Sequence, residues 1–135
     1  MNARHWIIVA LCFISPSAFA EWKSMGTFGD SVVYFETDTI RGDLREPKFW
    51  LMYDFPKGRT FPSGKAYRSL KIRYLAKCED ETTAIQTYVA YSEHKGAGSV
   101  VASEVNRDDQ LQWTPNVPQT IMQTIVDAFC NHAKK

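Results

Sequence analysis

The sequence predicts an α+β domain in which a six-stranded antiparallel sheet carries a C-terminal helix, packed on one face and tethered by a disulfide. Three observations lead to this fold class. Short runs of β-branched and aromatic residues, separated by Gly, Pro and Asp clusters, fill most of the chain after residue 20. A single apolar stripe of helical period follows near the C-terminus. Two cysteines, Cys78 and Cys130, lie in these two parts of the chain.

The first twenty residues have the three regions of a cleavable signal peptide. Arg4 and His5 precede the unbroken apolar run 6–14, and Ala18 and Ala20 frame an Ala-x-Ala cleavage site. A membrane-spanning helix needs about 20 apolar residues, far more than this run provides. We therefore predict cleavage after Ala20, with an uncleaved N-terminal anchor as the alternative.

Cleavage leaves residues 21–135, a length close to the commonest domain size of about 100–150 residues. Cys12 leaves with the signal peptide, and Leu11 before it disfavours a lipoprotein signal, which has Gly, Ala or Ser there. The mature chain holds as many Lys and Arg as Asp and Glu, so it has no general attraction to nucleic acid or to an anionic membrane. We expect one exported domain without a transmembrane segment.

Six segments of the mature chain have the composition of strands. They are 21–26, 31–37, 48–55, 66–78, 82–93 and 99–105. The fourth segment has the clearest two-residue alternation: the apolar Ile72 and Tyr74 are two positions apart and so point to the same face of the sheet. Lys71 and Arg73 share the other, which indicates one buried and one solvated face. Segment 56–65 contains two Pro and two Gly and is predicted to be an exposed loop.

The C-terminal segment changes from strand period to helix period. Its apolar stripe consists of Ile121, Met122, Ile125, Val126, Phe129 and Cys130. Thr120 followed by Gln123 fits a capping box, and Pro118 discourages helix upstream. The pattern predicts a terminal helix that lies on one face of the sheet as its second layer.

The two periodicities bring both cysteines to one interface. Cys78 has the parity of Tyr74 on the buried face of its strand, and Cys130 lies on the apolar stripe of the helix. In an oxidising compartment two cysteines allow one intramolecular pairing, so we predict a disulfide between helix and sheet. Two free thiols or a thiolate metal site are the alternatives, which the absence of Cys-x-x-Cys spacing disfavours.

No motif in the chain specifies catalysis or metal binding. Gly96-Ala97-Gly98 lacks the Lys-Ser/Thr of a phosphate loop and indicates a hairpin turn. Ser92, Glu93 and His94 are neighbours, which point to opposite faces in a strand and form no triad. Arg41-Gly42-Asp43 is the tripeptide that integrins bind, but we interpret it as a tight turn. We expect a non-enzymatic protein with no cofactor and no metal site.

The solvated face of the fourth segment is the best candidate for a partner-binding surface. It combines Tyr67, Lys71, Arg73 and Lys77, which makes it basic and partly aromatic. Lys and Arg on strand faces also provide solubility and block edge pairing, which is the alternative interpretation. We predict that these four residues contact a protein partner.

Several features come in a recognisable order along the chain. A Tyr-Phe-x-Thr-Asp-Thr-Ile run occupies 34–40, Tyr67-Arg68-Ser69-Leu70-Lys71 leads to Cys78, and Trp113-Thr114-Pro115 precedes the helix with Cys130. This order resembles the bacterial Surface-adhesin E family. The resemblance implies a six-stranded antiparallel sheet with a disulfide-tethered helix, in a Gram-negative envelope protein. It also implies binding of host extracellular-matrix or serum proteins, as in the type member.

Two functional hypotheses follow. The first is a non-enzymatic, adhesin-like binding module for a protein partner, located in the periplasm, at the outer-membrane surface or outside the cell. The second is a periplasmic protein that holds a small apolar ligand or an envelope component between sheet and helix. In this second hypothesis Trp22, Trp50 or Trp113 would line the pocket.

Overall fold

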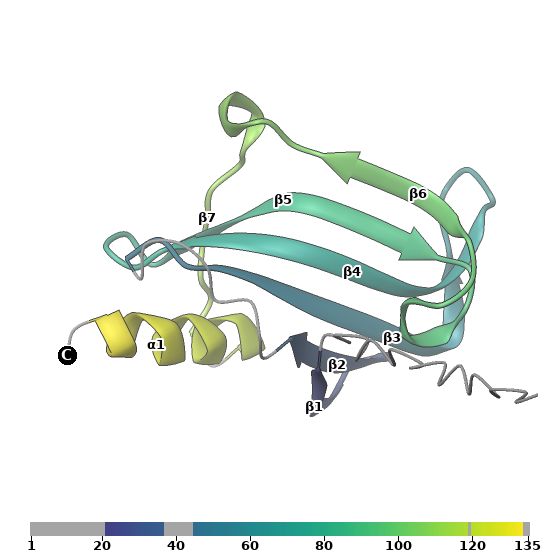
Figure 1. Cartoon of the computed structure of the whole chain (residues 1–135), viewed down its shortest axis with the longest axis horizontal. Coiled ribbons are helices and arrows are strands. Elements are labelled where there is room, and N and C mark those ends of the chain that lie inside the picture. Colours follow the sequence, from purple (N-terminus) through teal and green to yellow (C-terminus); the bar gives the residue numbers. More distant parts are fainter. Residues whose placement is uncertain (1–20, 37–44, 119, 134–135) are drawn as a thin grey trace, which may run out of the picture.

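An antiparallel sheet with one helix on it forms the fold in a computed structural model, which describes residues 21–36, 45–118 and 120–133 (Figure 1). The strands are β1 (Trp22–Phe28), β2 (Ser31–Glu36), β3 (Lys48–Thr60), β4 (Ala66–Lys77), β5 (Thr82–Tyr91), β6 (Val100–Val105) and β7 (Thr114–Pro115). The helix α1 spans Ile121–Ala133, and two 3-10 turns, η1 (His94–Gly96) and η2 (Asp108–Gln110), lie in loops. The strands β1 to β6 lie in the sheet in sequence order, each paired with its neighbours, and β7 pairs with β5. The predicted α+β fold class is confirmed.

Two elements differ from the sequence prediction. The short strand β7 was not expected, and β3 continues to Thr60 through most of the predicted loop 56–65. Residues 55–58 of β3 stand opposite Arg68 alone, so this stretch is a large bulge. A bulge accepts Pro56 because the proline nitrogen has no ladder hydrogen bond to make there. The expected signal peptide, 1–20, and the Arg41-Gly42-Asp43 turn lie outside the described residues.

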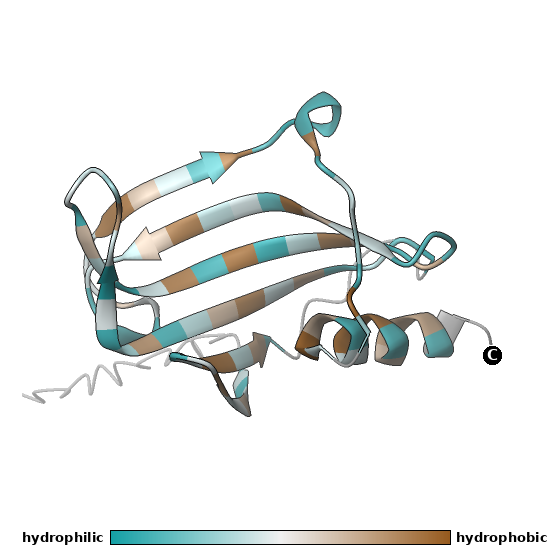
Figure 2. Cartoon of the chain, turned by 180° about the vertical axis from the view of Figure 1, so that it is seen from behind, coloured by the Kyte–Doolittle hydropathy of each residue, from teal (hydrophilic) through white to brown (hydrophobic). Residues whose placement is uncertain are grey.

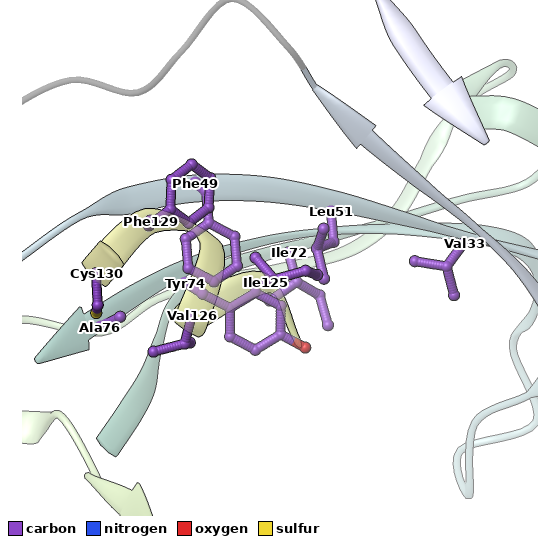
Figure 3. Packing of buried hydrophobic residues seen from close by; sticks show 10 residues of the cluster. All are labelled: Val33, Phe49, Leu51, Ile72, Tyr74, Ala76, Ile125, Val126, Phe129 and Cys130. Atoms are coloured by element: carbon purple, nitrogen blue, oxygen red, sulfur yellow. The ribbon is translucent and has the colours of Figure 1, made fainter. Parts of the chain in front are cut away.

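The core lies between α1 and the sheet face that the helix covers. Phe129 of α1 packs on Phe49, with 5.3 Å between ring centroids (Figure 3). It also packs on Phe35, whose ring centroid is 5.7 Å away. Along the central strands hydrophobic and hydrophilic residues alternate, and α1 has one apolar side (Figure 2). Thr120 caps the helix, because its Oγ1 accepts a hydrogen bond from the Gln123 N–H at 3.3 Å.

The predicted disulfide is present and joins the two layers. Cys78 follows the end of β4 and bonds to Cys130 of α1, with 5.5 Å between their Cα atoms. Cys130 is buried in the same cluster as Ala76 and Phe129. The bridge therefore fixes the C-terminal part of the helix to the central strand of the sheet. Within the described residues, no helix has the length and apolarity to cross a membrane.

Candidate functional site

The sheet face that points away from α1 carries cationic and aromatic side chains together. Ile72 and Tyr74 of β4 belong to the core beneath the helix, so Lys71 and Arg73, of the opposite parity, point outward. We call this surface the outer face. It comprises Trp22 of β1, Tyr34 of β2, Trp50 of β3, Lys71, Arg73 and Lys77 of β4, Tyr91 of β5, Lys95 of η1 and Trp113 before β7.

The lysines of the outer face lie over aromatic rings. The Lys71 ammonium is 5.3 Å from the ring centroids of both Trp22 and Tyr91. The Lys77 ammonium lies 4.2 Å from Trp113. These distances are within the range of about 6 Å at which a cation is attracted to the face of a ring. Ring contact restricts the lysine stems, so the positive charges are held at fixed places above the sheet.

The loop after β5 folds back over the outer face and is anchored to it. Ser69 is fully buried, at 0 % exposure; its Oγ donates to the Glu93 carbonyl at 2.6 Å and accepts from the Gly96 N–H at 2.8 Å. Asp54 Oδ1 accepts from the Lys95 N–H at 2.9 Å and lies 3.1 Å from Nδ1 of His94. The loop therefore delivers the Lys95 ammonium to a position 5.9 Å from the Tyr34 ring.

Gly96 lets this loop approach the sheet closely. Its φ of +73° lies in the left-handed region that favours glycine. A Cβ at this position would lie 2.6 Å from Cε of Lys71. The predicted Gly-rich hairpin turn is thus more than a connection, because it packs on the lysine at the centre of the outer face.

The sequence-predicted binding residues are only partly brought together. Lys71 and Arg73 lie side by side on the outer face, with Arg73 opposite Trp50 in the neighbouring strand. Lys77 extends the same face toward the end of β4. That Lys71, Arg73 and Lys77 contact a protein partner stays a prediction.

The prediction that Tyr67 lies on the solvated face of its strand is wrong, because the structure buries this side chain. It is 8 % exposed and stacks on Phe61, with 4.3 Å between ring centroids. Its ring also meets Phe55 edge-on at 5.7 Å. Phe55 lies in the bulge of β3 and Phe61 follows the end of that strand, so the bulged end of β3 covers the Tyr67 ring. Tyr67 is therefore part of a second hydrophobic cluster.

The tryptophans are also placed differently from the second functional hypothesis. Trp22 and Trp50 belong to the outer face, and Trp113 lies beside Lys77. The helix–sheet interface is instead filled by the cluster around Phe49 and Phe129. A tryptophan-lined pocket between sheet and helix is therefore absent from the described residues.

The described residues offer little catalytic or metal-binding chemistry. They contain no group of three or more His, Cys, Asp and Glu side chains that could hold a metal ion. His94 has a carboxylate partner in Asp54, whereas Ser92 Oγ accepts a hydrogen bond from the Ser99 N–H at 2.9 Å. Ser92 and His94 are thus engaged with different partners.

A small antiparallel sheet, one helix fixed to it by a disulfide, and an outer face of cations on aromatic rings define a domain of the α+β class. The chain belongs to the Surface-adhesin protein E family, whose model matches residues 22–131. No curated protein sequence is significantly similar to it.

Crystal structures of protein E from Haemophilus influenzae have a similar fold. Crystal form II shares 18 % sequence identity with the chain over 76 % of the chain and 83 % of protein E, with a TM-score of 0.57. A structure of protein E from non-typeable Haemophilus influenzae shares 15 % identity over 87 % of the chain and 82 % of protein E, with a TM-score of 0.58. At such low identity the likeness shows that the fold is shared.

Proposed function

We propose that this protein is an exported, non-enzymatic binding module of the cell envelope that contacts a protein partner through its outer face. The proposal includes removal of residues 1–20 as a signal peptide, since the family is one of surface adhesins. By the same family relationship, the partner is a host extracellular-matrix or serum protein.

The observation that carries the proposal is the fixed pairing of cations with rings on the outer face. Trp, Tyr and Arg dominate the binding energy of protein interfaces, because large rigid side chains bury much area at little entropic cost. Trp22, Tyr91 and Arg73 are of these types; Arg73 and Tyr91 lie on the adjacent strands β4 and β5, and the rings of Trp22 and Tyr91 meet at Lys71. The surface is therefore prepared for contact before the partner arrives.

The charge of the outer face defines the chemistry of that partner. Lys71, Arg73, Lys77 and Lys95 make the surface cationic. Two carboxylates on the same face, Asp54 and Glu36, are buried, and Asp54 is hydrogen-bonded to the loop. Complementary charge accelerates association and selects among partners. The partner should present acidic side chains around an apolar patch that covers the rings.

Charge reversal on the outer face tests this proposal. The variant Lys71→Glu/Arg73→Glu is compared with Lys57→Glu/Lys65→Glu, which makes the same change of charge on exposed residues of the β3–β4 hairpin. Biolayer interferometry measures binding of each purified protein to immobilised extracellular-matrix and serum proteins. We expect at least about a tenfold loss of affinity in the outer-face variant alone, as for truncation of an interface hot spot.

The control variant separates specific from general electrostatic effects. Circular dichroism must show both variants folded, because Lys71 is packed on two rings. Equal loss in both variants would indicate attraction by overall charge. Unchanged binding by the folded outer-face variant would remove the site from the proposal.

A further inference from the structure

A recessed surface lies on the helix-bearing side of the sheet, away from the outer face. It is bounded by β5, β6 and the segment 106–114, which runs from the end of β6 toward the start of α1 (Figure 2). Its volume is about 520 Å³. Ligand sites commonly enclose about 300–1,000 Å³, so the groove is large enough for a small molecule.

The rim of this groove is polar but almost uncharged. Its lining includes the side-chain amides of Asn106, Gln110 and Gln112 and the hydroxyl-bearing Thr83. Amides and hydroxyls both donate and accept hydrogen bonds. The one charged residue in the lining is Glu104, and neither Lys nor Arg contributes to it. The groove therefore favours a ligand rich in hydroxyl or amide groups and disfavours an anion.

The floor of the groove is apolar. Tyr74 and Tyr88 contribute rings, and Ile85 is 39 % exposed although it is a large hydrophobic residue. An apolar floor beneath a ring of neutral hydrogen-bonding groups matches a ligand with one apolar face and polar edges. A pyranose ring has this form, because its C–H bonds project from one face and its hydroxyls from the edge.

Several rim residues are held in place by the fold. Asn106 Nδ2 donates to the Ile85 carbonyl at 3.0 Å, and Gln110 Oε1 accepts from the Arg107 N–H at 3.1 Å. Glu104 and Gln112 differ, because neither side chain has a hydrogen bond or ion pair within the described part of the chain. These two groups are available to a ligand on a scaffold that is already ordered.

A second hollow of about 370 Å³ lies on the other side of Tyr74, which lines both. There the hydroxyl of Tyr74 lies 2.9 Å from that of Tyr53. Burial raises the pKa of both tyrosines, so both stay neutral at physiological pH. Asp30 and Arg59 form a bidentate ion pair at the edge of this hollow, at 2.7 and 2.8 Å. Tyr74, which is buried, stands between the two hollows.

We propose that this groove binds a neutral saccharide. The proposal does not depend on the outer face, which lies on the other side of the sheet. Two sources share the chemistry: uncharged glycans of host glycoproteins and the amino-sugar strands of the bacterial envelope.

Titration of the ¹⁵N-labelled protein by two-dimensional NMR tests the proposal. The probes are trimers of mannose, of galactose and of N-acetylglucosamine; the first two represent host glycans and the third represents envelope strands. We expect chemical-shift changes confined to Tyr74 and to residues 83–88 and 104–114, with a millimolar or lower dissociation constant. Gln112→Ala and Glu104→Gln should each weaken binding by about fivefold, the effect of one lost hydrogen bond.

Matched controls make the result decisive. Gln123→Ala makes the same substitution on α1, outside the groove, and should leave affinity unchanged. The outer-face variant Lys71→Glu/Arg73→Glu should also bind the trimers normally, which keeps this test separate from that of the proposed function. Selectivity for one kind of trimer identifies the source and supports the proposal.

Three results would overturn the proposal. One is the absence of shift changes with every trimer at millimolar concentration. Another is equal or tighter binding of a sulfated disaccharide, because the groove would then not select neutral ligands. The third is an equal response to a blocked triglycine, which has amides without a sugar ring.

Discussion

Removal of the disulfide should cost this domain a large part of its stability. The perturbation is the double substitution Cys78→Ala/Cys130→Ala, which leaves no free thiol from the pair. The bridge links residues 52 positions apart in the sequence. For a loop of that length, the loss of unfolded-chain entropy corresponds to about 4 kcal/mol at 25 °C. Domains of this size have unfolding free energies of only about 5–15 kcal/mol.

Thermal and urea unfolding, followed by circular dichroism, measure the effect. A loss of about 4 kcal/mol should lower the melting temperature by roughly 15 °C in a domain of this length. Reduction of the wild-type protein should lower its midpoint to that of the double variant, and the same reductant should leave the variant unaffected. If the oxidised wild type and the variant melt together, the bridge does not stabilise the helix on the sheet and our reasoning is wrong.

Three further predictions concern the loop anchor and the buried hydroxyls. Ser69→Ala should destabilise the protein by about 1–3 kcal/mol in urea unfolding, because it removes both hydrogen bonds of the buried Ser69 hydroxyl, to the Glu93 carbonyl and from the Gly96 N–H; a conservative Ser69→Thr that was equally destabilised would point to packing instead. Gly96→Ala should lower the unfolding free energy by about 1 kcal/mol, because alanine disfavours the positive φ at this position. The new Cβ should also displace the Lys71 side chain, which NMR would detect as a change in the Lys71 chemical shifts. The control Gly64→Ala, with open space around its Cβ, should leave those shifts unchanged. The raised pKa values of Tyr53 and Tyr74 predict stability that is fully present below the ordinary tyrosine pKa of about 10 and is lost as pH rises above it. Spectrophotometric titration should show two tyrosines that ionise only with unfolding, and early ionisation of every tyrosine would contradict this assignment.

The sequence was sufficient for the features that depend on local periodicity. Alternation along 66–78 and the helical stripe ending at Cys130 each identify a buried side, and the disulfide follows because both cysteines lie on those sides. The up-and-down strand order agrees with the short connections between successive strand-like runs. Local patterns fix these features because each is set by residues close together in the chain.

Features that depend on strand register could not be predicted. Tyr67 was expected to be exposed, but Phe55 in the bulge of β3 and Phe61 after that strand cover its ring, and Pro and Gly in that stretch indicated a loop. Lys71 meets Trp22 only because β1 to β4 pair in one particular register. Nothing in the sequence alone specifies that pairing, so the aromatic half of the outer face was missed.

Lysine footprinting of the protein bound to a matrix or serum protein tests the central claim most directly. Acetylation rates are measured by mass spectrometry for each lysine in the free and bound protein. We predict that Lys71, Lys77 and Lys95 react more slowly in the complex, while Lys57 and Lys65 on the β3–β4 hairpin react at unchanged rates. Protection of the two hairpin lysines, with Lys71, Lys77 and Lys95 unaffected, would contradict the claim that the outer face binds the partner.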